Sequence, residues 1–265
     1  MSIPIVPLVV ATALFMETMD SSLLSTALPA IARDLGVDPI ALKLAVTAYL
    51  VSLAIFIPAS GWIADRMGAR TTFRAALAVF MAASIGCATA SSMESFVAWR
   101  FVQGMGGAMM VPVGRLVLVR AIPKGDLVRA MSFLTMPSLL GPVMGPPLAG
   151  ALVTYADWRW IFLVNIPVAL LGIVMATIYF NDDRPDPVPL DIKGFALTSI
   201  ALPGVVLSAA LAGRHVASPL VAASCFTIGI FAAALYVVHA RRIDRPLLDL
   251  RLFAFETFSA GVAGG

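Results

Sequence analysis

Two carboxylates interrupt the apolar segment at the start of the chain. Glu17 and Asp20 lie three residues apart in FMETMDSSLLSTALP, residues 15–29, so they share one face of a helix. A carboxylate inside an apolar span is costly and marks an ion or proton pathway by default. The spacing therefore predicts that this segment handles a proton or a cationic ligand.

Two arginines interrupt a second apolar segment, FVAWRFVQGMGGAMMVPVGRLVLV. A charge at mid-membrane costs about 2.5–3.5 kcal/mol on insertion scales, so Arg100 and Arg115 each need a partner, water or an interface. Asp20 lies about 13 Å below the outer end of its helix and Arg100 about 8 Å below the outer end of its own. We expect these two side chains to meet in the outer half of a shared cavity, with Gln103 as a polar lining residue.

Structural readings of the same charges stay open. An Asp20–Arg100 pair could serve only to join two helices. Arg115 lies about a turn and a half from the inner end of its helix, and we interpret it as a structural charge that extends to the interface or pairs with Asp65.

The composition requires these residues to lie in membrane-spanning helices. Apolar residues make up 60% of the 265 and charged residues 12%, about half the charged share of a soluble domain. The mean hydropathy is +0.95. We predict an all-α polytopic membrane protein with eight spans and the start of a ninth near Phe258. The eight spans are expected at 5–29, 41–64, 73–91, 95–119, 130–153, 161–180, 194–213 and 217–239.

The distribution of Lys and Arg predicts the orientation of these spans. The loops on the side of the N-terminus hold twelve: Arg66, Arg70, Arg74, Arg120, Lys124, Arg129, Arg184, Lys193, Arg241, Arg242, Arg245 and Arg251. The loops on the other side hold four: Arg33, Lys43, Arg159 and Arg214. Because cytoplasmic loops carry the excess of basic residues, the N-terminus is expected in the cytoplasm.

Two further segments are rich in residues that control helix packing. The connection GWIADRMGAR contains Gly61, Asp65, Arg66, Gly68 and Arg70, which suit a tight turn at the membrane exit. Asp65 is expected to bind an arginine or a helix N-terminus, and an isolated Asp65 would be a solvated loop acid. The fifth span contains LLGPVMGPPLAG, with its helix-bending and close-packing residues at Gly141, Pro142, Gly145 and Pro146. This pattern predicts a bent, thin helix, and a plain kinked structural helix is the alternative.

These motifs together resemble the major facilitator superfamily. GWIADRMGAR looks like the signature between its second and third helices, RFVQGMGGA like its fourth-helix motif, and LLGPVMGPP like the fifth-helix motif of its antiporters. METMDSSLLSTALPAI and WRWIFLVNIPV are similar to patterns of the fourteen-helix drug:proton antiporter branch, the EmrB/QacA type. The ending GAR of the loop motif is less basic than usual in that family.

The resemblance implies an N-terminal six-helix bundle (1–180), a cytoplasmic linker (181–193), an accessory transmembrane hairpin (194–239), and a connector with the start of the C-terminal bundle (240–265). It implies proton-driven export of lipophilic, often cationic compounds across the bacterial inner membrane. In this family the first-helix acid, here Asp20, is implicated in substrate or proton handling, and the fourth-helix arginine, here Arg100, in proton transfer. The loop motif is implicated in the conformational switch and the fifth-helix motif in bending and in limiting leak.

Length is the largest departure from the family, because these 265 residues do not include the second six-helix bundle of that family. We therefore expect the chain to be a fragment that needs this half to complete a transport cavity. An exporter or facilitator of one specific metabolite on the same fold is the main alternative, and a non-transporting membrane scaffold is another. Enzymatic activity, a metal, a cofactor and a nucleic-acid partner are not expected.

Overall fold

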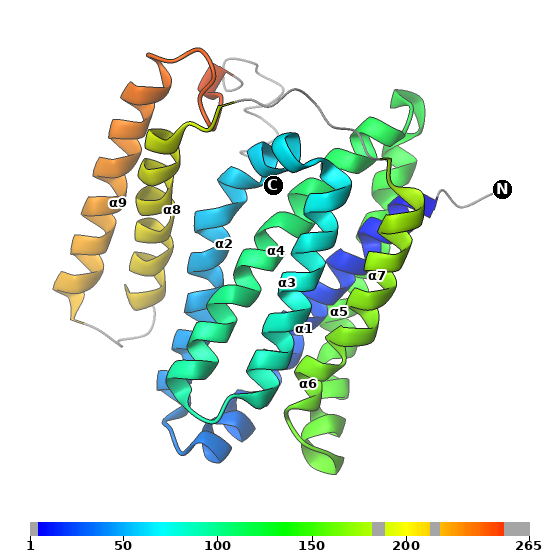
Figure 1. Cartoon of the computed structure of the whole chain (residues 1–265). Helices are drawn as coiled ribbons and strands as arrows, with labels where there is room; N and C mark the ends of the chain where they lie inside the picture. Colours follow the sequence, from blue (N-terminus) through cyan, green and yellow to red (C-terminus); the bar gives the residue numbers. More distant parts are fainter. Residues whose placement is uncertain (1–4, 182–188, 213–217, 252–265) are drawn as a thin grey trace. The chain divides into compact units, whose positions relative to one another are not determined.

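The computed structural model describes residues 5–181, 189–212 and 218–251. In these ranges the chain forms nine α-helices and a short 3-10 helix, and no strand (Figure 1). The helices are α1 (Ile5–Leu35), α2 (Pro39–Met67), α3 (Ala69–Thr89), α4 (Met93–Ala121), η1 (Lys124–Asp126), α5 (Leu127–Tyr155), α6 (Trp160–Leu163), α7 (Asn165–Tyr179), α8 (Ile192–Ala212) and α9 (Pro219–Ala240). They divide into two compact units, before and after residue 188.

Eight helical segments in the described ranges are long and apolar enough to cross a membrane. This confirms the predicted all-α polytopic class. Helix α1 continues through Pro29 to Leu35 instead of ending at residue 29, because Ile31 and Ala32 in its last turns are buried. The expected ninth span, and the loop arginines Arg184 and Arg214, lie outside the described residues.

Local signals in the sequence start the helices of the first unit. The Asp38 carboxylate accepts a hydrogen bond from the Ile40 backbone N–H at 2.7 Å, and Pro39 occupies the first position of α2. Ser92 and Ser95 form a reciprocal capping box at the start of α4. Both arrangements satisfy backbone donors that a helix start leaves free.

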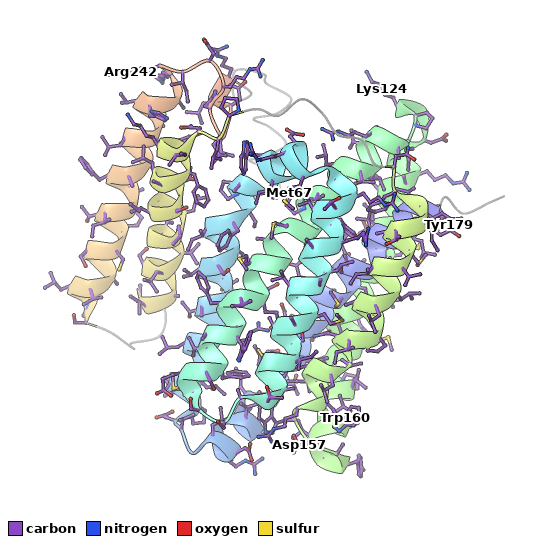
Figure 2. All side chains as sticks on the ribbon, viewed as in Figure 1. Met67, Lys124, Asp157, Trp160, Tyr179 and Arg242 are labelled. Atoms are coloured by element: carbon purple, nitrogen blue, oxygen red, sulfur yellow. The ribbon has the colours of Figure 1, made fainter. Side chains whose placement is uncertain are left out.

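The first unit is a helix bundle whose successive spanning segments run in opposite directions, with α6 and α7 together forming the last of them (Figure 1). Figure 2 shows Met67, Lys124 and Tyr179 at one end of this bundle and Asp157 and Trp160 at the other. Helix α4 packs on α2 and α3, and α1 packs on α5 and α7. This places α1 and α4, which carry the two expected charge sets, in contact inside the bundle.

Glycines let α4 pack closely on both of its neighbours. A Cβ at Gly104 would lie 2.6 Å from the carbonyl oxygen of Tyr49 on α2, and a Cβ at Gly106 would lie 2.8 Å from the carbonyl oxygen of Ala76 on α3. Small residues at such positions allow helices to approach closely in a membrane. The segment QGMGG therefore acts as a packing surface between α2 and α3.

The second unit is the α8–α9 hairpin with the segment that follows it. A Cβ at Gly204 would lie 2.9 Å from the Cα of Gly229, so the two helices cross through glycines. Beside the start of α8, Asp191 lies 2.7 Å from Nε2 of His239 and accepts backbone hydrogen bonds from Gly194 at 2.8 Å and Leu247 at 3.3 Å. This carboxylate thus connects both helices to the segment after α9.

We predict that acid weakens this hairpin through Asp191. Burial raises the pKa of the Asp191 carboxyl, but the hydrogen bonds from His239, Gly194 and Leu247 outweigh it and hold the pKa below its usual range. A depressed carboxyl pKa stabilises the fold above the unfolded-state pKa, near 3.9, and this stability is lost as pH falls through the folded-state pKa. Hydrogen exchange of the first turn of α8, corrected for intrinsic pH dependence, should therefore accelerate below about pH 4.

Two variants test that assignment. Asp191→Asn should remove the acid-dependent acceleration, whereas the exposed Asp249→Asn should retain it. An unchanged acid response in Asp191→Asn would contradict the assignment.

Candidate functional site

A buried ion pair joins α1 to α4. The Arg100 guanidinium donates a hydrogen bond to Oδ2 of Asp20 at 2.7 Å, and each side chain is 1% exposed. This is the contact that helix depth predicts. Removing one partner of a buried pair leaves an uncompensated charge, whereas the two charges of an intact pair compensate each other.

Three polar side chains complete the network around this pair. Gln103 donates to Oδ1 of Asp20 at 3.0 Å and accepts from Arg100 at 2.6 Å. Asn165, at the start of α7, also donates to Oδ1 of Asp20 at 3.0 Å, and Gln103 donates to Ser84 of α3 at 3.0 Å. The Asp20 carboxylate thus accepts hydrogen bonds from three donors, one of which is a charged guanidinium. The network connects α1, α3, α4 and α7.

The aromatic ring of Tyr49 covers the Arg100 side of this network. Cζ of Arg100 lies 4.5 Å from the centre of the Tyr49 ring, a cation–π distance. The Tyr49 hydroxyl donates in the opposite direction, to Oε1 of Glu17 at 3.4 Å. A Cβ at Gly107 would lie 2.8 Å from that hydroxyl, so the glycine makes room for it. Tyr49 consequently contacts both the buried pair and the second acid of α1.

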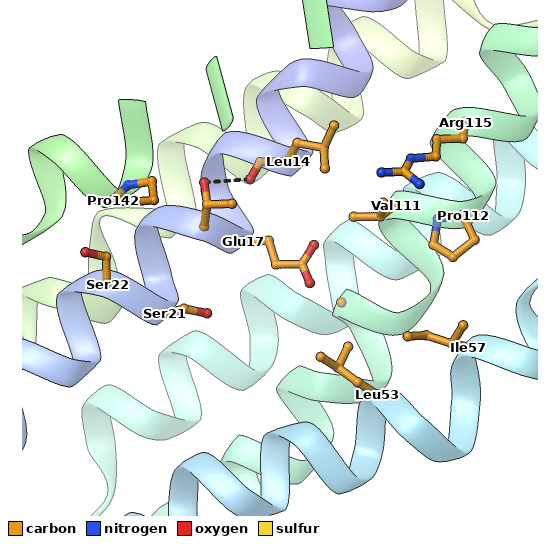
Figure 3. Close-up of a pocket in the computed structure, with 12 residues that line it drawn as sticks. Leu14, Glu17, Ser21, Ser22, Leu53, Ile57, Val111, Pro112, Arg115 and Pro142 are labelled. Atoms are coloured by element: carbon orange, nitrogen blue, oxygen red, sulfur yellow. Dashed lines mark hydrogen bonds between the residues drawn. The ribbon is translucent and has the colours of Figure 1, made fainter. Parts of the chain in front are cut away.

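A separate cavity of about 720 Å³ lies between α1, α2, α4 and α5 (Figure 3). Glu17, Ser21, Arg115 and Pro142 are among the residues that line it, together with apolar side chains. Its volume is in the range that holds drug-sized ligands. Neither Asp20 nor Arg100 lines it, so the expectation that this pair meets within a shared cavity is not met. The pair instead lies closed in the interior, and Glu17 is the acid that faces the cavity.

The second arginine of α4 also lies on the cavity wall. Arg115 is exposed there, and Figure 3 shows its guanidinium directed toward the space that Glu17 also faces. It does not pair with Asp65, because Asp65 accepts from Arg120 at 3.0 Å. Arg120 follows Arg115 by five residues, and it is the one that lies at the end of α4 beside the α2–α3 connection.

The loop motif forms the connection between α2 and α3. Gly68 has φ +85° and ψ 141°, a conformation that L side chains rarely adopt. Arg66 lies over the Trp62 ring, with Cζ 5.6 Å from its centre. Arg70 donates to the carbonyl oxygen of Thr177 near the end of α7. Together with the Asp65–Arg120 pair, these contacts attach one short turn to α4 and α7.

We predict that Gly68→Ala destabilises the protein by about 1–3 kcal/mol, because alanine is strained at this positive φ. Denaturation in detergent would measure the loss. Gly61→Ala is the matched control, since a Cβ there meets no heavy atom within 4 Å; equal losses in the two variants would refute the explanation from φ.

The fifth-helix motif packs directly against the acidic stretch of α1. A Cβ at Gly141 would lie 2.8 Å from the backbone nitrogen of Met19, and one at Gly145 would overlap Oγ of Ser22. Pro142 and Pro146 lie inside α5, which is helical through both. The motif therefore brings the α5 backbone against the helix turn that carries Glu17 and Asp20.

Sequence reasoning missed three residues of the buried network: Tyr49, Ser84 and Asn165. Each is a polar side chain in an apolar run, which is a signal that could have found Asn165 in FLVNIPV. Serine and tyrosine are common enough in membrane helices that Ser84 and Tyr49 carry little signal alone.

Comparisons with known proteins fit this arrangement. The family model described as Major Facilitator Superfamily matches residues 10–263. The chain belongs to the major facilitator superfamily.

Its relatives and structural neighbours lie in the same superfamily or share its fold. The chain is 39% identical over 258 residues to MdtD of Escherichia coli (strain K12), a protein named provisionally for multidrug resistance, covering 97% of this chain and 54% of the relative. Two solved structures share the fold: a peptide transporter, POT, in complex with sulfate (TM-score 0.66, 19% identity, 91% of this chain and 53% of that chain), and a D-xylose–proton symporter (TM-score 0.61, 14% identity, 90% and 68%). The chain thus spans about half the length of the curated relatives that it matches, and it is a multi-pass membrane protein.

Proposed function

We propose that this chain is the N-terminal portion of a proton-driven exporter of lipophilic, often cationic compounds in the bacterial inner membrane. The observation that carries the proposal is a closed Asp20–Arg100 pair next to an apolar cavity with its own acid, Glu17. The name of MdtD, which refers to multidrug resistance, supports a drug-like cargo. The excess of basic residues at the end of the bundle with the α2–α3 connection supports a cytoplasmic N-terminus.

In this proposal Asp20 and Arg100 form the coupling pair. In the described conformation the Asp20 carboxylate accepts hydrogen bonds from Arg100, Gln103 and Asn165. When the bundle moves and Arg100 releases Asp20, the freed carboxylate loses its donors and takes up a proton. Proton binding at Asp20 then favours one conformation and loss of the proton favours the other, so the proton gradient drives alternation.

Cargo binds at Glu17 in this scheme. A bound cation and a proton both reduce the charge of this carboxylate, so each lowers the affinity for the other by the same factor. Tyr49 contacts Glu17 through its hydroxyl and Arg100 through its ring, which makes it the connection between cargo site and coupling pair. The α2–α3 turn contributes the conformational switch, and Gly141, Pro142, Gly145 and Pro146 seal α5 against α1.

A second six-helix half is part of the proposal, because substrate sites in this superfamily lie between the two halves near the midplane. In the proposed complete transporter, the residues that line the described cavity form one side of a larger binding site.

Gradient-driven transport of unrelated cations tests this function. The protein as encoded by its gene is reconstituted into vesicles, a pH gradient is imposed, and movement of ethidium is followed with and without tetraphenylphosphonium. The proposal expects transport only with the gradient, and competition between the two cations. Transport of one metabolite without such competition would instead support the specific exporter. No transport with any gradient would contradict both.

A further inference from the structure

The described cavity is lined by an acidic and a basic side chain that do not pair with each other. Among its lining residues, Glu17 on α1 is the acidic residue and Arg115 on α4 is the basic residue. Figure 3 shows both side chains directed into the space between these helices. No ion pair or hydrogen bond joins them within the described part of the chain, although the Arg115 charge acts on Glu17 through space.

Neighbouring groups satisfy the other charges near this site. Asp20 is paired with Arg100, and Asp65 with Arg120. The Glu17 carboxylate accepts one hydrogen bond, from Tyr49, and the Arg115 guanidinium donates to no acceptor within the described residues. Two groups able to bind charged ligands therefore face the same cavity.

The rest of the cavity wall is mainly apolar, with Leu14, Leu53, Ile57 and Val111 between the charged groups. A cargo with one charge would compensate one of the two groups and bury the other away from water without a partner, which is costly. A cargo that carries both charges on an apolar body compensates both groups at once. This difference discriminates between cargo classes.

We propose that the preferred cargo is an amphipathic zwitterion, bound with its ammonium group at Glu17 and its anionic group at Arg115. This inference rests on the proposed export function and names its substrate class. Leu53 and Ile57 of α2 contact the apolar body, and the hydroxyl of Tyr49 orients the Glu17 carboxylate.

Equilibrium binding of three matched probes tests the proposal. One probe is an aromatic ring that carries an aminoalkyl arm and a carboxyalkyl arm on opposite sides, and the other two each lack one arm. Binding to the purified protein in lipid nanodiscs is measured without any pH gradient. The zwitterion should bind at least about tenfold more tightly than either singly charged probe, a difference of about 1.4 kcal/mol.

Variants of the two charged residues should change the ranking in opposite ways. Arg115→Gln should remove the preference for the zwitterion over the amine, and Glu17→Gln should remove its preference over the acid. Arg33→Gln, at the end of α1 and away from the cavity, is the matched control and should keep the wild-type ranking.

Several outcomes would overturn the inference: the amine or the acid binding most tightly to the wild type, equal binding of all three probes, or a ranking that neither variant changes. Each can occur while gradient-driven export of ethidium persists, so the proposed function would survive. Conversely, the predicted ranking without any gradient-driven export would support the cargo class and contradict the proton-coupled mechanism.

Discussion

Asp20→Asn should destabilise the protein by about 3–5 kcal/mol, because it leaves the Arg100 guanidinium buried without a counter-charge. It should also abolish export driven by a pH gradient, since the amide cannot exchange a proton. The double variant Asp20→Asn/Arg100→Gln should recover most of the lost stability, as neutral replacement of both partners often does. It should still not export. Chemical denaturation in detergent and vesicle transport measure the two properties.

The double variant separates a coupling role from a purely structural one. If the pair only joins α1 to α4, recovered stability should bring recovered export, and that result would refute the coupling role. Asp34→Asn is the matched control on the same helix, because its partner Arg159 and Asp34 itself are partly exposed, at 34% and 44%. Partly exposed pairs contribute about 1 kcal/mol or less.

Gly106→Ala should destabilise the first unit by about 1–3 kcal/mol, the usual cost of overpacking. The new Cβ would lie 2.8 Å from both the Ala76 carbonyl oxygen and the Phe80 backbone nitrogen, so α3 and α4 must separate. Backbone atoms cannot rotate away as a side chain can. Denaturation measurements would quantify the loss, and transport should fall with it because α4 carries Arg100.

Gly150→Ala is the control for helix propensity in this comparison. A Cβ at Gly150 on α5 meets no heavy atom within 4 Å, so alanine there should be neutral or stabilising by up to about 1 kcal/mol. Stabilisation by Gly106→Ala to the same extent would show that α3 and α4 do not pack as described.

Most of the fold is predictable from the sequence, because the length and hydropathy of a segment are sufficient to identify a membrane helix. About 20 apolar residues are needed to cross the hydrocarbon, and each expected span overlaps one helical segment of the structure. Ends are harder to predict. From the sequence, residues 30–35 are expected to form a loop after Pro29. In the structure they are helical and belong to α1, and Ile31 is buried.

The Asp20–Arg100 contact was also predictable, because equal depth on two antiparallel helices restricts the choice of partner. Asp65 does bind an arginine, but this is Arg120 and not Arg115, which was one of the two possibilities for Arg115. Depth does not distinguish the two arginines, since they lie within about two turns of each other. Which of them reaches Asp65 depends on how α4 is rotated about its axis, and in the structure Gly104 faces α2 and Gly106 faces α3. This information exists only once the helices are assembled.

Accessibility of the two acids could not be read from the sequence for the same reason. Glu17 and Asp20 are three residues apart and share a helix face, yet one lines a cavity and the other is 1% exposed. Asn165 and Gln103 both donate hydrogen bonds to Asp20 and surround it in the interior. Asn165 lies 145 residues after Asp20 in the chain.

Labelling by dicyclohexylcarbodiimide tests this difference between the two acids most directly. The reagent is apolar, reaches carboxyl groups from within the membrane and modifies their protonated form, and mass spectrometry of peptides distinguishes modification at residue 17 from modification at residue 20. Glu17 should be labelled in the wild type while Asp20 is protected, and Arg100→Gln should expose Asp20 to labelling. Labelling of Asp20 in the wild type as fast as Glu17 would contradict a closed coupling pair beside an open cargo acid.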